Sequence, residues 1–350
     1  MQRTFTIAFL AVLLALAAPA QAAQNDSTPT GEPTAPAPTP FEVAKGLAAK
    51  GRLDKALAQL DQLAAKTPEE PGVERLRGII LYQQEQLPEA VAAFTKAEAE
   101  DPSDRESIEM HGVSLFRLGR APEALPFLEK AHAAVERANI DPQYVLGLCY
   151  ENLTRYDDAR HAFAAQYGFA PDSAEAYLLA GRLFLRGEFA DEAAVQVHKA
   201  LEINPALPLA HQLLGEVALA KGDTAGAILE LEAERKLNPL DGVLYDRLGD
   251  AYLRSGQYAD AQQALNRAIL LEPGSTAPYI LLGQTLLKLQ QPIQALHYLD
   301  RAAKMDPSNY ITFNLLGQAF KATGQVAEAN HAFKICADLQ HDGKSQSAGR

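Results

Sequence analysis

The chain has 350 residues, of which 47% are hydrophobic, and it carries a formal net charge of −12. Its length suits two or three ordinary domains or one elongated array of repeats. The acidic balance and the lack of a Lys/Arg run argue against a nucleic-acid partner, because binding to phosphates requires a positively charged surface.

The first 22 residues have the pattern of a secretory signal peptide. Arg3 precedes an uncharged apolar run from Phe5 to Ala18, and Ala20 to Ala22 supply the small residues of a cleavage site. The apolar run is shorter than the roughly 20 residues that a helix needs to cross a membrane. We therefore expect cleavage of residues 1–22, no transmembrane span afterwards, and export to the periplasm or cell envelope, or secretion from a single-membrane host. An uncleaved membrane anchor is the alternative.

Residues 23–40 contain five prolines and no large apolar side chain. Such a segment buries too little surface to offset the entropy of ordering it, so we expect a Pro/Thr/Ala-rich linker. At the other end, residues 341–350 are expected to form a polar tail.

Prolines recur through the rest of the chain at a spacing of 34 residues. The longest uninterrupted series is Pro171, Pro205, Pro239, Pro273 and Pro307, and Pro68 and Pro102 keep the same spacing. Asn139 is a single inserted residue. This period defines nine units, which are 37–70, 71–104, 105–138, 140–173, 174–207, 208–241, 242–275, 276–309 and 310–343.

Three positions of the unit are nearly constant. Position 8 is glycine after the first unit, at Gly78, Gly112, Gly147, Gly181, Gly215, Gly249, Gly283 and Gly317. Position 20 is alanine in every unit, at Ala56, Ala90, Ala124, Ala159, Ala193, Ala227, Ala261, Ala295 and Ala329. Position 24 is always large and apolar, as in Phe94 and Leu265. The period therefore describes the whole protein.

Glycine inside a helix costs about 1 kcal/mol relative to alanine, so its recurrence predicts a steric need. We expect two helices in each unit, with the glycine of the first against the alanine of the second and position 24 filling the core. No period-2 strand pattern competes, so the fold is expected to be all-α.

Residues that favour helix ends agree with these boundaries. Left-handed turns are expected between the helices of a unit at Gly51, Gly119, Gly222, Gly256 and Gly324. Prolines then mark the starts of second helices at Pro88, Pro122 and Pro292. Candidate N-caps of the following first helices are Asp104, Ser173, Asp241, Ser275 and Asn309.

The 34-residue pattern resembles the tetratricopeptide repeat family over residues 37–343. Departures are Ala44 in the glycine column, Glu136 and His341 in the proline column, and no tryptophan at position 4. The resemblance implies an α-solenoid over residues 41–340, a right-handed superhelix of about nine helix–turn–helix repeats. It also implies a concave face lined by the first helix of each repeat.

Positions 5 and 9 of the first helices fall on that face. The predicted groove residues are Tyr144, Leu148, Leu178, Arg182, Gln212, Glu216, Asp246, Asp250, Ile280, Gln284, Asn314 and Gln318. The groove is expected to be apolar toward its N-terminal end and acidic near Glu216, Asp246 and Asp250. Two interpretations of Asp246 and Asp250 stay open, because water can screen these like charges or a bound cation can meet them. We expect a protein or peptide partner with apolar residues at one end and a basic residue at the other.

No pattern of residues indicates chemistry. The nucleotide, hydrolase and metalloprotease motifs are absent, so no catalytic, cofactor or metal residues are predicted. His161, His297 and His331 share position 22, where surface histidines are favoured over a metal site. Cys149 and Cys336 lie five units apart, so no disulfide is expected between them.

The sequence thus predicts an exported, non-enzymatic interaction scaffold, used in envelope assembly, secretion or polysaccharide export. One alternative is an accessory subunit of an enzyme such as a glycosyltransferase. Another is a self-assembling structural protein, since no polar capping helix follows the ninth unit and a homodimer through Phe333 and Ile335 of that unit would cover its apolar end.

Overall fold

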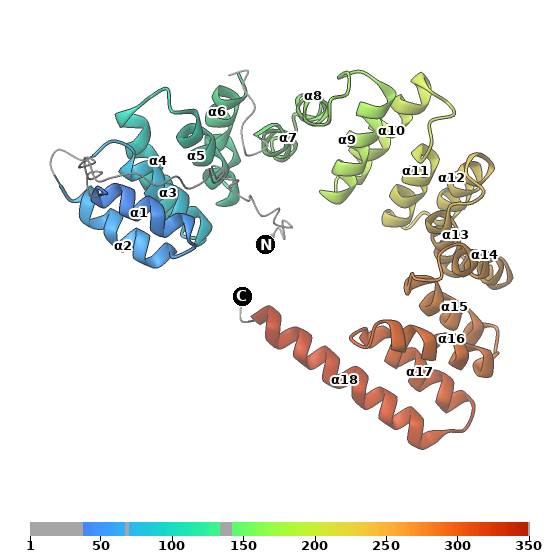
Figure 1. Cartoon of the computed structure of the whole chain (residues 1–350). Coiled ribbons are helices and arrows are strands. Elements are labelled where there is room, and N and C mark those ends of the chain that lie inside the picture. The colour runs from blue at the N-terminus through green and yellow to red at the C-terminus, as the bar shows by residue number, and fades with distance from the viewer. Residues whose placement is uncertain (1–37, 67–69, 134–141, 349–350) are drawn as a thin grey trace, which may run out of the picture. The chain divides into compact units, whose positions relative to one another are not determined.

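The computed structural model describes residues 38–66, 70–133 and 142–348 and shows eighteen α-helices and no strand within them (Figure 1). The expected signal peptide of residues 1–22, most of the linker, Pro68, Glu136 and Asn139 lie outside the described residues. Among the described residues, no helix combines the length and apolar character needed to cross a membrane. The all-α prediction is confirmed.

The chain divides into two compact units, residues Met1–Gly168 and Phe169–Arg350. The first unit contains α1 (Pro40–Ala49), α2 (Leu53–Ala64), α3 (Val73–Gln83), α4 (Leu87–Glu100), α5 (Arg105–Arg117), α6 (Ala121–His132), α7 (Pro142–Asn152) and α8 (Tyr156–Tyr167). The second contains α9 (Ala174–Arg186), α10 (Ala190–Ile203), α11 (Ala210–Ala220), α12 (Thr224–Leu237), α13 (Gly242–Arg254), α14 (Tyr258–Leu271), α15 (Ala277–Lys288), α16 (Pro292–Met305), α17 (Tyr310–Ala322) and α18 (Val326–Ala348).

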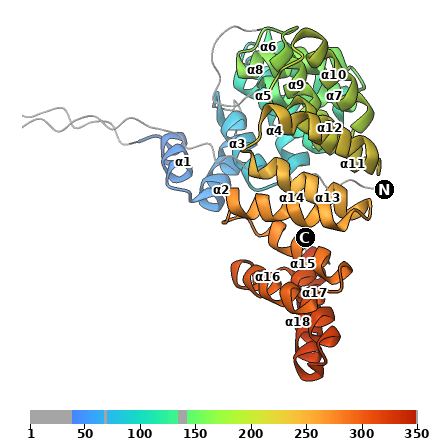
Figure 2. The same cartoon turned by 90° about the vertical axis from the view of Figure 1, so that its right-hand side faces the viewer.

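Each 34-residue repeat of the sequence folds as one pair of helices. The two helices of a pair pack against each other, as α13 and α14 do in both views of the molecule (Figures 1 and 2). Within each compact unit, the second helix of a pair also packs against the first helix of the next pair. The predicted solenoid of helix–turn–helix repeats is therefore confirmed within each of the two units.

Glycine at position 8 makes room for the large side chain at position 24. A Cβ atom built on Gly78 would lie 2.7 Å from the Phe94 ring, and one built on Gly112 would lie 2.9 Å from Leu128 Cγ. The sequence predicted alanine at position 20 as the partner of this glycine, but the atoms nearest to the built Cβ come from position 24. At Gly181 the carbonyl oxygen of Ala193, at position 20, also lies close, 3.1 Å from the built Cβ.

The physical reason is the length of the position-24 side chain. It reaches across the helix interface onto the glycine Cα, whereas the methyl group of the alanine one turn earlier is too short to do so. Position 20 is nevertheless at most 3% exposed in every repeat. Its small size therefore suits a buried position within the helix pair.

The turn between paired helices uses a left-handed residue at position 15 in all nine repeats. Five are the predicted glycines, such as Gly51 (φ 69°) and Gly256 (φ 79°). The other four are not glycine, and they are Glu85, Thr154, Glu188 and Gln290, with φ between 58° and 66°. The backbone geometry of the turn is thus kept even where the sequence opposes it.

The predicted helix ends are confirmed except at two N-caps. Asp241 and Asn309 each accept two backbone amides of the following helix, and Ser173 accepts the amide of Ala176. Asp104 is the N-cap of α5 but its side chain accepts no capping amide, because it accepts the Ser107 hydroxyl instead. Ser275 is not an N-cap, since α15 starts one residue later than expected, after Thr276.

The ends of the described array also differ from the expected boundaries. Thr39 caps α1 through a capping box with Glu42, so the expected linker gives way to helix at its last residue, Pro40. At the other end, α18 continues through residues 341–348, within the segment that was expected to form a polar tail.

Candidate protein-binding surface

The first helices of neighbouring repeats form a continuous layer within the second unit. Each of α9, α11, α13, α15 and α17 contacts the next, whereas no comparable contact joins neighbouring second helices in the described part of the chain. The repeats therefore converge on the side of their first helices. This layer is the inner surface of the second unit.

Ten of the twelve predicted groove residues lie on this layer. Tyr144 and Leu148 lie on α7 in the first unit, where both are half-buried and the Tyr144 ring packs on Phe163 with centroids 5.8 Å apart. The residues in the second unit are Leu178 and Arg182 on α9, Gln212 and Glu216 on α11, Asp246 and Asp250 on α13, Ile280 and Gln284 on α15, and Asn314 and Gln318 on α17.

Four polar residues of this layer form one network that joins α11 to α13. Glu216 Oε1 accepts hydrogen bonds from Gln212 Nε2 at 3.2 Å and from Arg247 Nε at 3.4 Å. Arg247 also donates from Nη1 to Asp246 Oδ2 at 3.3 Å. Arg247 stands at position 6, outside the positions considered in the sequence. Its reach across two repeats could not be inferred from spacing alone.

Asp246 is a buried carboxyl in this network. It is only 8% exposed, and its Oδ1 atom is buried without a hydrogen-bond partner. Burial raises the pKa of Asp246 to about 6, nearby Arg247 opposes this rise, and Asp250 and Glu272 add to it. Because its carboxyl group is buried, water does not screen the charge of Asp246 from that of Asp250.

The cations that meet the acidic pair come from the chain itself. Arg254 forms an ion pair at 2.8 Å with Asp250, which lies one helical turn earlier, and Arg247 forms an ion pair with Asp246. Glu216, Asp246 and Asp250 thus face two arginines, which leaves one formal negative charge unmatched in this group. Farther along the layer, Gln318 donates to Asn314 at 2.5 Å.

An exposed apolar row runs beside these polar residues and was missed in the sequence. Position 2 of successive repeats is Leu209 (37% exposed), Val243 (38%), the exposed Ala277 and Ile311 (46%). Position 2 belongs to the same helix face as positions 5 and 9, so the signal was present. Exposed apolar side chains in a row mark contact surfaces in soluble proteins.

At Leu209, the first residue of this row, the backbone amide is hydrogen-bonded to a buried carboxylate. Leu209 has a left-handed backbone (φ 69°), and its amide donates to Glu234 Oε1 at 2.8 Å. Glu234 is fully buried and also accepts the Gln212 amide at 3.3 Å. Position 27 is alanine in several repeats, so Glu234 is a local replacement that fixes the start of α11.

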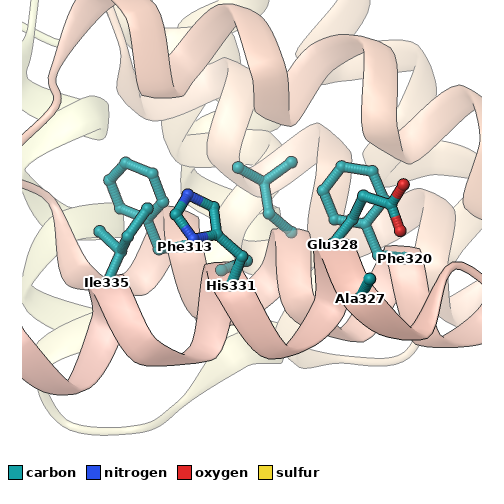
Figure 3. Close-up of a pocket in the computed structure, with 8 residues that line it drawn as sticks. Phe313, Phe320, Ala327, Glu328, His331 and Ile335 are labelled. Atoms are coloured by element: carbon teal, nitrogen blue, oxygen red, sulfur yellow. The ribbon is translucent and has the colours of Figure 1, made fainter.

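A second candidate surface is a cavity of about 390 Å³ at the last helix pair. Its lining residues are Phe313, Leu316 and Phe320 from α17 and Ala327, Glu328, His331, Ala332 and Ile335 from α18. Figure 3 shows the Phe313 and Phe320 rings at opposite ends of the cavity with His331 between them. The lining is mainly apolar, with Glu328 and His331 as its polar side chains.

The histidines and cysteines are not gathered into a site by the described residues. No group of three or more His, Cys, Asp or Glu residues able to hold a metal is found there. His297 packs edge-on against Tyr298, and His331 lines the cavity. Cys149 and Cys336 are both buried and free, and burial raises the pKa of the Cys149 thiol to about 11.

One buried carboxyl of the first unit was also missed. Glu151 on α7 is 2% exposed, and its Oε2 atom has no hydrogen-bond partner. Burial raises its pKa to about 7, which places the carboxyl near the middle of its titration at neutral pH.

Solved structures resemble parts of this chain at low sequence identity. MamA from Desulfovibrio magneticus RS-1 is 21% identical, with 49% of this chain and 97% of that chain covered and a TM-score of 0.46. YrrB, described as a TPR protein with an unusual peptide-binding site, is 21% identical, with 52% and 94% covered and a TM-score of 0.45. PilF from Pseudomonas aeruginosa is 21% identical, with 47% and 76% covered and a TM-score of 0.44.

Comparison with curated proteins gave no match. Family models described as tetratricopeptide repeat match residues 43–105 and 252–307. The first match lies in the first unit and the second lies in the second unit. Together with the recurring helix pair and its glycine, alanine and turn positions, these matches show that the chain carries tetratricopeptide repeats in both of its units.

Proposed function

We propose that this protein is an exported, non-enzymatic scaffold that binds a segment of another protein on the inner surface of its second unit. Tetratricopeptide repeats and the helix-pair fold support a protein–protein interaction scaffold. Export is supported by the signal-like pattern of residues 1–22. An envelope assembly, secretion or polysaccharide-export complex is the setting that this pattern favours.

The exposed row of Leu209, Val243 and Ile311 is the observation that carries the binding proposal. Val243 and Ile311 lie on first helices of one continuous layer, and Leu209 is the N-cap residue of α11 in the same layer. Packed helices stand about 8–10 Å apart, and an extended segment advances about 3.3 Å per residue. A segment crossing this layer therefore meets a new helix roughly every three residues, and its apolar side chains can rest on the row.

The charge of the neighbouring network suits a basic residue on the same segment. Glu216, Asp246 and Asp250 outnumber their partners Arg247 and Arg254 by one. A bound Lys or Arg would supply the missing charge beside the apolar row. Because Arg247 and Arg254 already pair with these carboxylates, we expect this residue to add selectivity and salt dependence more than affinity.

A matched pair of substitutions tests where the segment binds. Peptides are selected from a random displayed library against the intact protein, and their affinities are then measured for Val243→Asp and Leu270→Asp. Leu270 is 70% exposed on α14, a second helix, so the same substitution there controls for an added charge. We expect binding to weaken at least about tenfold for Val243→Asp and to stay unchanged for Leu270→Asp, because a buried carboxylate without a partner is costly.

Equal effects of the two substitutions would contradict binding at the inner surface. The electrostatic part is tested separately by charge reversal at Glu216, Asp246 and Asp250. We expect weaker binding of basic peptides and a smaller salt dependence, with little effect on peptides that lack Lys and Arg. If all selected peptides respond alike, the basic-residue part of the proposal is wrong while the apolar part stands.

A further inference from the structure

The cavity at the last helix pair is one half of an interface that is complete between earlier repeats. In the preceding repeat, positions 4, 7 and 11 are Tyr279, Leu282 and Leu286, which are 8%, 0% and 1% exposed. There α17 packs against both α15 and α16, and its Leu315 and Ala319 share a core cluster with Leu282 and Leu286. A following first helix therefore covers these positions.

In the last repeat the same three positions are Phe313, Leu316 and Phe320, and all three line the cavity. No further first helix follows α18 among the described residues. The cavity, whose lining residues Figure 3 shows, thus has the position and the apolar character of an inter-repeat interface, and no helix of the described residues covers it.

The opposite end of the array offers a first helix with an open packing side. Positions 3, 7 and 10 of α13 are Leu244, Leu248 and Ala251, which are at most 1% exposed. In the first repeat these positions are the exposed Thr39, which is the N-cap of α1, Val43, which is 39% exposed, and Gly46, whose built Cβ meets no atom within 4 Å. The side of α1 that would face a preceding repeat is therefore small, partly apolar and accessible among the described residues.

We propose that α1 of one copy packs into the C-terminal cavity of a second copy, as the first helix of a tenth repeat. The small residues of α1 permit the close approach that inter-repeat packing requires, and the cavity supplies the apolar surface. This contact joins two different surfaces, so each added copy leaves one free cavity and one free α1. The result is a head-to-tail chain of copies rather than a closed pair.

Electrostatics sets the conditions under which this association is strongest. Each copy carries a formal charge of −12, so copies repel one another at low ionic strength. The proposed contact is mainly apolar. Association is therefore expected to increase as salt is added, which is opposite to the behaviour of a contact built from salt bridges.

Two arginine substitutions separate the two surfaces. Gly46→Arg blocks the open side of α1, and Ala327→Arg blocks the cavity from an exposed position on α18. Gly274→Arg is the control for the first, because Gly274 also has open space around its built Cβ. Ala322→Arg is the control for the second, because Ala322 is an exposed alanine outside the cavity lining.

Sedimentation of the full chain over a wide concentration range reads out the assembly, and circular dichroism confirms that each variant is helical. The N-terminal segment is the same in every protein. We expect the parent and both control variants to form growing oligomers at high salt, while Gly46→Arg and Ala327→Arg stay monomeric. A mixture of these two variants should form a heterodimer and stop there, because one intact α1 and one intact cavity remain.

Three results would overturn the proposal. The parent protein could stay monomeric at high concentration and high salt, which would show that the cavity accepts no second copy. Gly46→Arg could associate as the parent does while Ala327→Arg does not, which would indicate a symmetric pairing of C-terminal repeats. The mixture could stay monomeric, which would show that α1 and the cavity are not partners.

Discussion

Position 8 of each repeat lies beneath a large side chain of the paired helix. Gly249 is covered by Leu265, as Gly78 is covered by Phe94. The need for glycine at this position could be predicted from its recurrence, because a helix keeps such a residue only where a side chain would collide. The identity of the covering residue could not, since that depends on side-chain direction and reach rather than on spacing.

Gly249→Ala tests this contact against a propensity control. Both Gly249→Ala and Gly46→Ala gain about 1 kcal/mol of helix propensity, but only the first places a methyl group against a neighbouring side chain, that of Leu265. Overpacking typically costs about 1–3 kcal/mol. We expect urea unfolding to show Gly249→Ala less stable than Gly46→Ala by that amount.

Second-site changes identify the partner of Gly249. Leu265→Val should recover part of the loss in the Gly249→Ala background, because it shortens the covering side chain. Ala261→Gly should recover nothing. If Ala261→Gly recovered the lost stability and Leu265→Val did not, the residue that Gly249 accommodates would be Ala261 rather than Leu265.

Asp246 predicts a pH dependence of stability. Burial raises its pKa from 3.8 to about 6, so the folded state holds the proton more tightly than the unfolded state does. Ionisation therefore destabilises the fold as pH rises through this window, by up to about 3 kcal/mol. Asp246→Asn should thus raise stability relative to the parent more at pH 8 than at pH 4. Denaturant midpoints at the two pH values give the comparison, and an equal difference at both would contradict the buried-carboxyl account.

The turn between paired helices shows which constraint wins when local preference and repeat geometry disagree. Position 15 is left-handed in every repeat, although four repeats place a non-glycine residue there. In the repeat with Gly187 and Glu188, the glycine stands one position early, and Glu188 takes the left-handed conformation (φ 66°) while Gly187 does not. The packing of the two helices fixes the backbone conformation of the turn, and position 15 adopts the left-handed conformation even in repeats that lack glycine there.

Gln290→Gly is therefore expected to stabilise the protein. A left-handed conformation costs a non-glycine residue about 1–2 kcal/mol, and the added freedom of glycine in the unfolded chain offsets part of the gain. We expect a net increase of roughly 0.5–1 kcal/mol in the free energy of unfolding. Ser255→Gly, at the right-handed position before Gly256, is the control and should destabilise instead. A loss of stability in Gln290→Gly would show that the Gln290 side chain contributes more than its backbone strain costs.

At the scale of the whole molecule, the period predicted the number and order of the helix pairs because each pair is specified by residues within its own 34. The candidate site was predicted only in part. Positions 5 and 9 were placed on the correct helices, but the bridge from Glu216 to Arg247 and the exposure of Val243 depend on how neighbouring repeats pack. The division after Gly168 had no signal in the proline or glycine columns.

Export makes a prediction about the N-terminus of the protein in its host. Small residues at Ala20 and Ala22 place the cleavage site after Ala22. Intact-mass measurement of the protein recovered from the envelope or medium should therefore give a chain that begins at Ala23. Recovery of the chain with Met1 to Ala22 still attached, in the membrane fraction, would support the anchor instead.

Site-specific photocrosslinking in the native host tests the central claim most directly. A photoreactive residue is placed at Val243 on the inner surface or at Leu270 on a second helix, both of which are exposed. The account predicts that Val243 captures a single protein through one short segment, that charge reversal at Glu216, Asp246 and Asp250 reduces this product and its salt dependence, and that Leu270 captures none of it. Capture of the same protein from Leu270 but not from Val243 would contradict binding at the inner surface.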